Sequence, residues 1–152
     1  MTLPAILMDD DPVLRTVSEP VVAIDDEVRD LVHTMVDVLQ DRAGRGLAAI
    51  QIGVPKRVLV VREQLQRLHG YRPFINPTIV RTLNRSTVER EGCLSIPPRK
   101  WGNVSRPAKC DVTWTELDGI ERTATLTGET ARIFQHEFDH LNGVLMTDRM
   151  AA

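Results

Sequence analysis

One motif near the end of the chain constrains the fold more than any other feature. It has the pattern H-E-x-x-H and spans His136 to His140. Residues four apart lie one turn above each other on a helix, so the two imidazoles can bind one ion. Glu137 would then lie close to a water on that ion and could take its proton. The alternative interpretation is two unrelated histidines on a core helix, but the helical setting favours a metal site.

The segment around this motif has the pattern of a buried helix. It runs from about Gly128 to Leu141, and Asn142-Gly143 is typical of a left-handed C-cap. Two adjacent stripes recur at helical spacing: Ala131, Phe134, Phe138 and Leu141, beside Ile133, His136 and His140. We therefore expect this helix to be buried around much of its circumference.

Strand patterns occupy the middle of the chain, whereas helices are predicted towards its two ends. A first helix is predicted from an N-cap at Asp25 or Asp26 to near Asp41, after an irregular N-terminal arm. Strands are predicted at 57–61, at 74–77 with a possible continuation to 82, and as a hairpin over 110–115 and 120–126 that turns at 118–119. This order favours an α+β fold, with antiparallel or mixed small sheets packed around a buried C-terminal metal-binding helix and an N-terminal helix outside.

Composition excludes several classes of protein. The 152 residues fit one domain, spanning 1–152, with 42% hydrophobic and 26% charged residues. A net charge of −2 gives no reason to expect nucleic-acid binding. No apolar stretch is long enough to span a bilayer and the N-terminus lacks the pattern of a signal peptide, so we expect no membrane association and a cytoplasmic location. Two cysteines are too few for a disulfide framework, although one bridge could form.

A catalytic ion of this kind needs a third protein ligand and one open position. Only twelve residues follow His140, and their sole carboxylate, Asp148, lies beyond the break at Asn142-Gly143. The ligand is therefore expected upstream, and Cys93 is the leading candidate because a thiolate is a strong ligand for a first-row ion. The alternative is a small buried hydrophobic residue, which is the interpretation we give to Cys110 in its alternating strand.

The segment Gly44–Gln51 combines two glycines with two alanines. Such small residues allow the backbone to approach another strand or a ligand closely. The glycine spacing is wrong for a phosphate-binding loop, and no Lys-Ser or Lys-Thr pair follows it. A tight helix-to-strand connection is the alternative interpretation.

Together, the three segments resemble the signature motifs of the peptide deformylases. They read G-x-G-L-A-A-x-Q, E-G-C-L-S and H-E-x-D-H in that order. The resemblance extends through 11–15, 75–77 and 140–145 and covers most of the chain. It implies removal of the formyl group from the N-terminal methionine of newly made bacterial or organellar proteins.

The resemblance also implies a role for each residue of the motifs. Cys93, His136 and His140 would hold the ion, with Fe(II) as the native metal and zinc, nickel or cobalt able to occupy the same site. Glu137 would take the proton of the attacking water and return it to the leaving amine. The side-chain amide of Gln51 and the backbone N–H of Leu94 would stabilise the oxyanion.

The expected partners are N-formylmethionyl peptides and nascent chains at the ribosome of a bacterial cytoplasm. By the same resemblance, Gly46, Arg45 and Glu91 would contact an extended substrate. Arg45 stands where the family usually carries an aliphatic residue, and Glu89 and Arg90 add charge near the expected methionine pocket.

Two other functions remain open at this point. One is a related hydrolase that acts on another N-acyl group or small amide; the other is a metal-binding homologue without activity. A zinc protease that cuts internal peptide bonds is disfavoured, because no downstream ligand is present.

Overall fold

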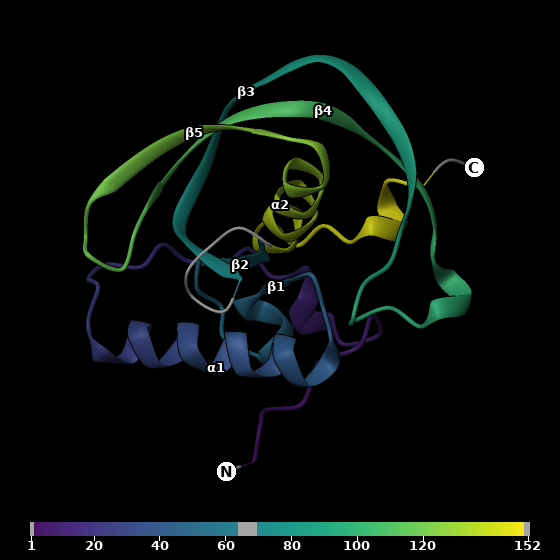
Figure 1. The fold of residues 1–152 in the computed structure, drawn as a ribbon. Helices are drawn as coiled ribbons and strands as arrows, with labels where there is room; N and C mark the ends of the chain where they lie inside the picture. The colour runs from purple at the N-terminus through teal and green to yellow at the C-terminus, as the bar shows by residue number, and fades with distance from the viewer. Residues whose placement is uncertain (1, 64–69, 151–152) are drawn as a thin grey trace.

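The strands form one bent antiparallel sheet around a central helix (Figure 1). The computed structural model describes residues 2–63 and 70–150. The five strands pair in chain order: β1 (Gly46–Ala48), β2 (Val58–Arg62), β3 (Tyr71–Glu91), β4 (Gly102–Thr115) and β5 (Glu121–Thr127). The α+β class is confirmed. The small sheets that we expected are joined into one, because β3 is long enough to belong to both halves.

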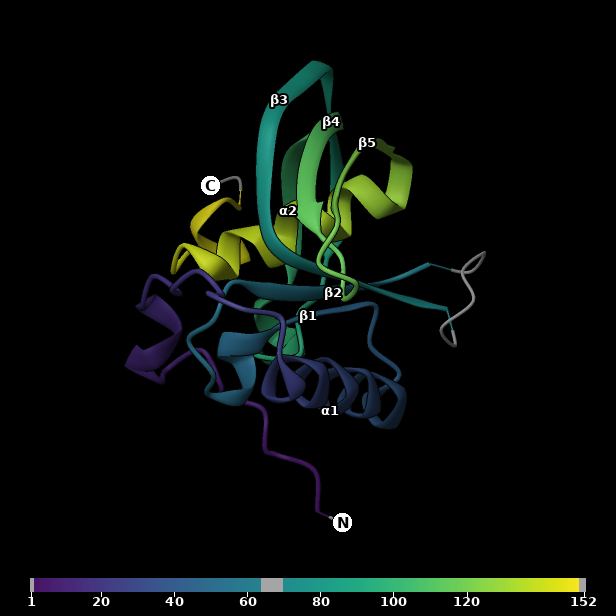
Figure 2. The ribbon, with the colours of Figure 1, turned by 90° about the vertical axis from the view of Figure 1, so that its left-hand side faces the viewer.

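The helix α2 (Gly128–Leu141) lies inside the bend of this sheet. In Figures 1 and 2 the long strands β3, β4 and β5 curve over one side of it, while β1 and β2 lie on the other. Phe134 of α2 packs edge-on against Phe74 with ring centroids 5.0 Å apart, and Phe74 packs against Trp114 at 4.8 Å. The predicted burial of this helix is confirmed, including that of both its histidines.

The helix α1 (Asp26–Arg42) covers the opposite face of β1 and β2, as Figure 2 shows. Alternate residues of β2 therefore enter two separate cores: Leu59 and Val61 belong to the cluster around α2, whereas Val58 and Val60 belong to the cluster under α1. The Asp25 side chain caps α1 by accepting a 3.0 Å bond from the Val28 N–H, as the sequence predicts.

Strand β3 differs most from its prediction. The expected turn at Asn76-Pro77 is a register shift between Ile75 and Thr78, with Asn76 in the left-handed region at φ 48°, and the strand continues beyond it. Two further register shifts follow before β3 ends at Glu91. Because β3 ends there, it delivers the Gly92-Cys93 turn directly to the interior of the bend.

Neither helix in the described part of the chain is long and apolar enough to cross a bilayer. The assignment of residues 1–152 to one domain stays a prediction.

Candidate metal centre

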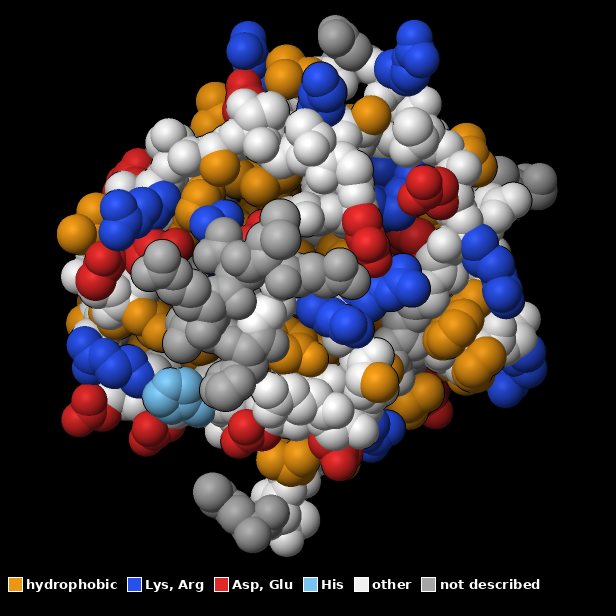
Figure 3. Space-filling model, in the orientation of Figure 1, with side chains coloured by type: hydrophobic (Ala, Val, Ile, Leu, Met, Phe, Trp, Pro, Cys, Tyr) orange, Lys and Arg blue, Asp and Glu red, His pale blue; other side chains and the backbone are white. Residues whose placement is uncertain are grey.

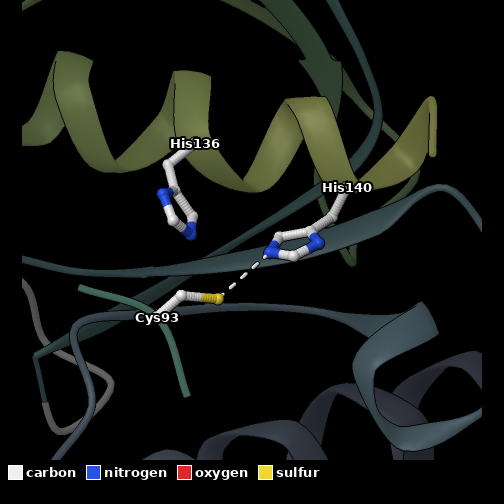
Figure 4. A group of neighbouring side chains, drawn as sticks. All are labelled: Cys93, His136 and His140. Atoms are coloured by element: carbon white, nitrogen blue, oxygen red, sulfur yellow. Dashed lines mark hydrogen bonds between the residues drawn. The ribbon is translucent and has the colours of Figure 1, made fainter. Parts of the chain in front are cut away.

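Three of the predicted residues meet in the interior of the bend (Figure 4). His136 and His140 project from α2 with ring centroids 5.2 Å apart, and Cys93 approaches from the turn after β3. The Cys93 Sγ lies 3.4 Å from the Nε2 of His140, and the three ligand atoms are all within 4.8 Å of one another. One thiolate and two imidazoles suit a first-row ion such as iron or zinc, and three protein ligands leave a position open. These residues therefore fit a catalytic metal.

Glu91 fixes the orientation of His136. Its Oε1 lies 2.9 Å from the Nδ1 of His136, which leaves the Nε2 free to face an ion. Burial acts to raise the pKa of Glu91, but the hydrogen bonds from His136 and Arg106, with the charge of Arg106, outweigh it and hold that pKa at about 2. Glu91 is therefore ionised at neutral pH and favours the tautomer in which Nδ1 carries the proton.

A buried arginine links this carboxylate to a second one. The guanidinium of Arg106 donates to both oxygens of Glu91, at 2.5 and 3.0 Å, and to the Oδ2 of Asp139 at 2.9 Å. Arg149 donates to Asp139 from the other side, at 2.6 Å. Arg106 and Arg149 were not predicted, because neither belongs to a motif. A signal for Arg106 would have been its place two residues after Val104 on one strand face, but that strand was predicted only from residue 110.

Glu137 lies against the backbone of Gly46. A Cβ on Gly46 would stand 2.7 Å from the Oε2 of Glu137 and 2.6 Å from the Cγ2 of Ile133, so a larger residue would force these side chains to shift. The Oε1 of Glu137 has no hydrogen-bond partner among the described residues. Burial raises the pKa of Glu137 to about 7. A carboxyl group with such a pKa is suited to accept and return a proton near neutral pH.

The side chain of Gln51 is held with its amide nitrogen towards the centre. Its Oε1 accepts a 2.9 Å bond from the Ala48 N–H, and its Nε2 donates to the Ser95 Oγ at 3.0 Å and lies 3.7 Å from the Cys93 Sγ. The neighbouring Leu94 N–H finds no acceptor in the described part of the chain. Both expected oxyanion donors are therefore beside the Cys93 sulfur.

A cleft of about 500 Å³ opens from the centre to the surface. Gly46, Arg45 and Glu91, the residues expected to contact substrate, all line it. Arg45 forms an exposed ion pair with Glu129 at 3.1 Å, whereas both oxygens of Glu91 are engaged by buried partners. Figure 3 shows basic and acidic side chains gathered on this face of the molecule, close to one another.

Comparison with known proteins agrees with this geometry. The family model described as polypeptide deformylase matches residues 3–152. The chain belongs to the polypeptide deformylase family. The resemblance noted in the three motifs is thereby confirmed, and this deformylase family consists of metal-dependent hydrolases.

Relatives match almost the whole chain. The peptide deformylase of Rhizobium meliloti is 45% identical over 153 residues, which cover 97% of this chain and 85% of that protein. The crystal structure of peptide deformylase from Thermotoga maritima matches with a TM-score of 0.93 and 34% identity, covering 100% of both chains. A class I type b peptide deformylase from Acinetobacter baumannii, crystallised with Met-Ala-Ser bound, matches with a TM-score of 0.90 and 28% identity, covering 98% of this chain and 99% of that one.

Proposed function

We propose that this chain removes the N-formyl group from the N-terminal formylmethionine of nascent polypeptides and releases formate. The observation that carries the proposal is the position of Glu137, a buried carboxyl group with one free oxygen, beside a Cys-His-His cluster that opens into a cleft. Membership of the deformylase family supports the same reaction. The bacterial relatives support a bacterial cytoplasm as its location and nascent chains at the ribosome as its substrates.

Cys93, His136 and His140 would hold one divalent ion, which we propose is Fe(II), with zinc, nickel or cobalt able to take its place. When bound, such an ion supplies a Lewis acid that polarises the formyl carbonyl and lowers the pKa of water. Glu91 supports this by holding the Nδ1 of His136. We therefore propose that Glu91 positions a metal ligand, with no direct contact to substrate, because its oxygens are already engaged.

Glu137 would move the proton of the reaction. It would accept a proton from the attacking water and deliver it to the amine of the departing peptide. Its burial beside the Cys-His-His cluster and its free oxygen support both steps. The Glu137 side chain packs closely against Gly46, and both residues line the cleft.

Gln51 and Leu94 would donate hydrogen bonds to the formyl oxygen as it becomes negative. The bonds of Gln51 to Ala48 and Ser95 hold the amide in place before the reaction, so little reorganisation is needed when charge develops. This preorganisation supports the role of an oxyanion donor.

The peptide would bind along β1. In the part of the chain that the structure describes, this strand lies at the edge of the sheet and pairs with β2 alone, so its other side can pair with an extended chain. Arg45 and Gly46 would flank that peptide. The Acinetobacter baumannii relative with Met-Ala-Ser bound supports a short peptide as ligand.

A formate-release assay on formyl-Met-Ala-Ser with iron- or nickel-loaded protein tests the proposal. Wild type should release formate, and Glu137→Gln should keep its metal, because no ligand changes, while losing at least ~10²–10⁴ in rate. Acetyl-Met-Ala-Ser serves as the matched control, with both peptides followed by the free α-amine that either cleavage yields. Faster cleavage of the acetyl peptide would favour action on another N-acyl group. A metal-loaded wild type that releases no formate would overturn the proposed function.

A further inference from the structure

The cleft runs from the centre along α2 towards the start of that helix. Arg132 lies one turn before His136, and Ile133 lies one turn before Glu137, which places each pair about 6 Å apart along the axis. Glu129 lies one further turn away, at the mouth. The side chain of the residue that carries the formyl group branches off next to the bond that is broken. It therefore has to enter this part of the cleft, and a methionine side chain is long enough to reach the level of Arg132.

Arg132 is held at this level by one face of β3. Its guanidinium donates to Thr87 Oγ1 at 3.0 Å, to Glu91 Oε2 at 2.6 Å and to the Val104 carbonyl at 3.0 Å, and it forms an ion pair with Glu89 Oε2 at 2.8 Å. Both terminal nitrogens of the guanidinium are hydrogen-bonded, and these contacts hold it against β3 and β4. The side chain of Glu89 remains 61% exposed and lines the cleft, so it presents a carboxylate to any occupant.

The mouth carries a second charged pair. Arg45 and Glu129 approach to 3.1 Å from the loop before β1 and from the first turn of α2, and their side chains are 72% and 63% exposed. An ion pair this exposed contributes little stability and can rearrange when a ligand arrives. Between this pair and the centre, the cleft wall combines the apolar Ile133 with the charged Arg132 and Glu89.

We propose that this cleft accepts a polar side chain on the residue that carries the formyl group, with glutamine as the matched example, at least as well as methionine. The inference rests on the proposed function and names its substrate class; the bond that is broken is unchanged. Glutamine is close to methionine in length, and its amide can donate to Glu89 or Glu129 and accept from Arg45. The thioether of methionine would shield these charged groups from water without forming hydrogen bonds to them, and such desolvation is unfavourable.

Kinetics with three formyl peptides of equal length test this preference. The kcat/KM of metal-loaded wild type is measured for formyl-Met-Ala-Ser, formyl-norleucine-Ala-Ser and formyl-Gln-Ala-Ser by formate release. An apolar pocket would favour methionine and norleucine over glutamine by roughly tenfold or more. We expect glutamine to equal or exceed both apolar side chains.

The double variant Arg45→Ile, Glu129→Leu tests whether the mouth sets this preference. Both residues are exposed, so the fold should survive, and the methionine-to-glutamine ratio should rise about tenfold through KM. Arg122→Ile, which breaks an exposed pair with Asp118 far from the cleft lining, is the matched control and should leave the ratio unchanged. A wild-type preference for methionine above tenfold, or a ratio that the double variant does not change, overturns the inference. Formate release from none of the peptides would overturn the proposed function and this inference with it.

Discussion

Replacing Gly46 by alanine should disable the enzyme more than it unfolds it. The added Cβ would stand 2.7 Å from the Oε2 of Glu137, about 0.7 Å short of the 3.4 Å at which ordinary van der Waals contact begins. The carboxylate must therefore move by a large part of an ångström, and a misplacement of ~1 Å at a catalytic group can reduce the rate by ~10². Overpacking of this kind typically costs ~1–3 kcal/mol, which corresponds to roughly 2–12 °C in Tm for a chain of this size.

The Cβ added at Gly46 would also stand 2.6 Å from the Cγ2 of Ile133, and a variant that removes this second contact provides the control. In the double variant Gly46→Ala, Ile133→Ala the contact with Ile133 is gone while that with Glu137 remains. We expect Tm to recover in part and kcat on formyl-Met-Ala-Ser to stay low. Elemental analysis should find the metal retained in both variants. A folded, metal-loaded Gly46→Ala protein with the kcat of wild type would refute the reasoning, and full recovery of kcat in the double variant would show that the effect passes through Ile133.

Three further predictions concern single side chains. Gln51→Ala should lower kcat by ~10²–10³ with little change in KM, because an oxyanion donor acts once charge has developed; a change in KM alone would remove that role. Cys93→Ala should lose metal while Cys110→Ala keeps metal and activity, and equal loss in elemental analysis would contradict the ligand assignment. Burial, with a smaller effect of Asp111, raises the pKa of Cys110 from 9.0 to about 11. The folded state therefore binds more protons there, and the free energy of unfolding should fall between pH 9 and 11, by up to ~1.4 kcal/mol per unit of pKa shift; urea titrations of Cys110→Ala should lack this slope.

Helix limits were predictable because their signals are local. The Asp25 cap and the glycine after α2 fix helix ends through bonds and dihedral angles within a few residues. Gly143 adopts φ 74°, and a Cβ there would lie 2.5 Å from the carbonyl of Arg15, so both the conformation and the packing require glycine. The cap at Asp25 and the dihedral angle of Gly143 are set by neighbouring residues. The close approach of Gly143 to Arg15 is the one long-range contact in this comparison.

The length of β3 was not predictable in the same way. Its second half is rich in polar residues, and three register shifts interrupt the alternation that marks a half-buried strand. Much of that half is solvent-exposed, so no hydrophobic pattern identifies it. Pairing with β4 stabilises it, and pairing partners cannot be read from one segment alone.

The sequence could place the expected ligands and Glu137 together because their spacing is tied to one helix and one turn. The charges that support them were missed because they meet only in the folded chain. Arg106 comes from β4, Arg132 from α2, and both bind Glu91 of β3. An arginine in a sequence is usually exposed. The one local signal, the place of Arg106 two residues after Val104, has a meaning only once the strand is known to start before residue 110. The expected contact of Glu91 with substrate was inferred from its motif, without knowledge of those partners.

The support of Arg132 by β3 also limits how this chain can change in length. Thr87, Glu89 and Glu91 are two residues apart, so they share the face of the strand that meets α2. Inserting or deleting one residue between the register shift at Leu83/Ser86 and Glu91 would turn alternate side chains outward and take the carboxylate away from His136. Changes of two residues would preserve the face, as would a single change absorbed by another bulge. We therefore expect this stretch of β3 to tolerate length changes in steps of two residues, or a single change only where a new bulge absorbs it, although most of its surface faces solvent.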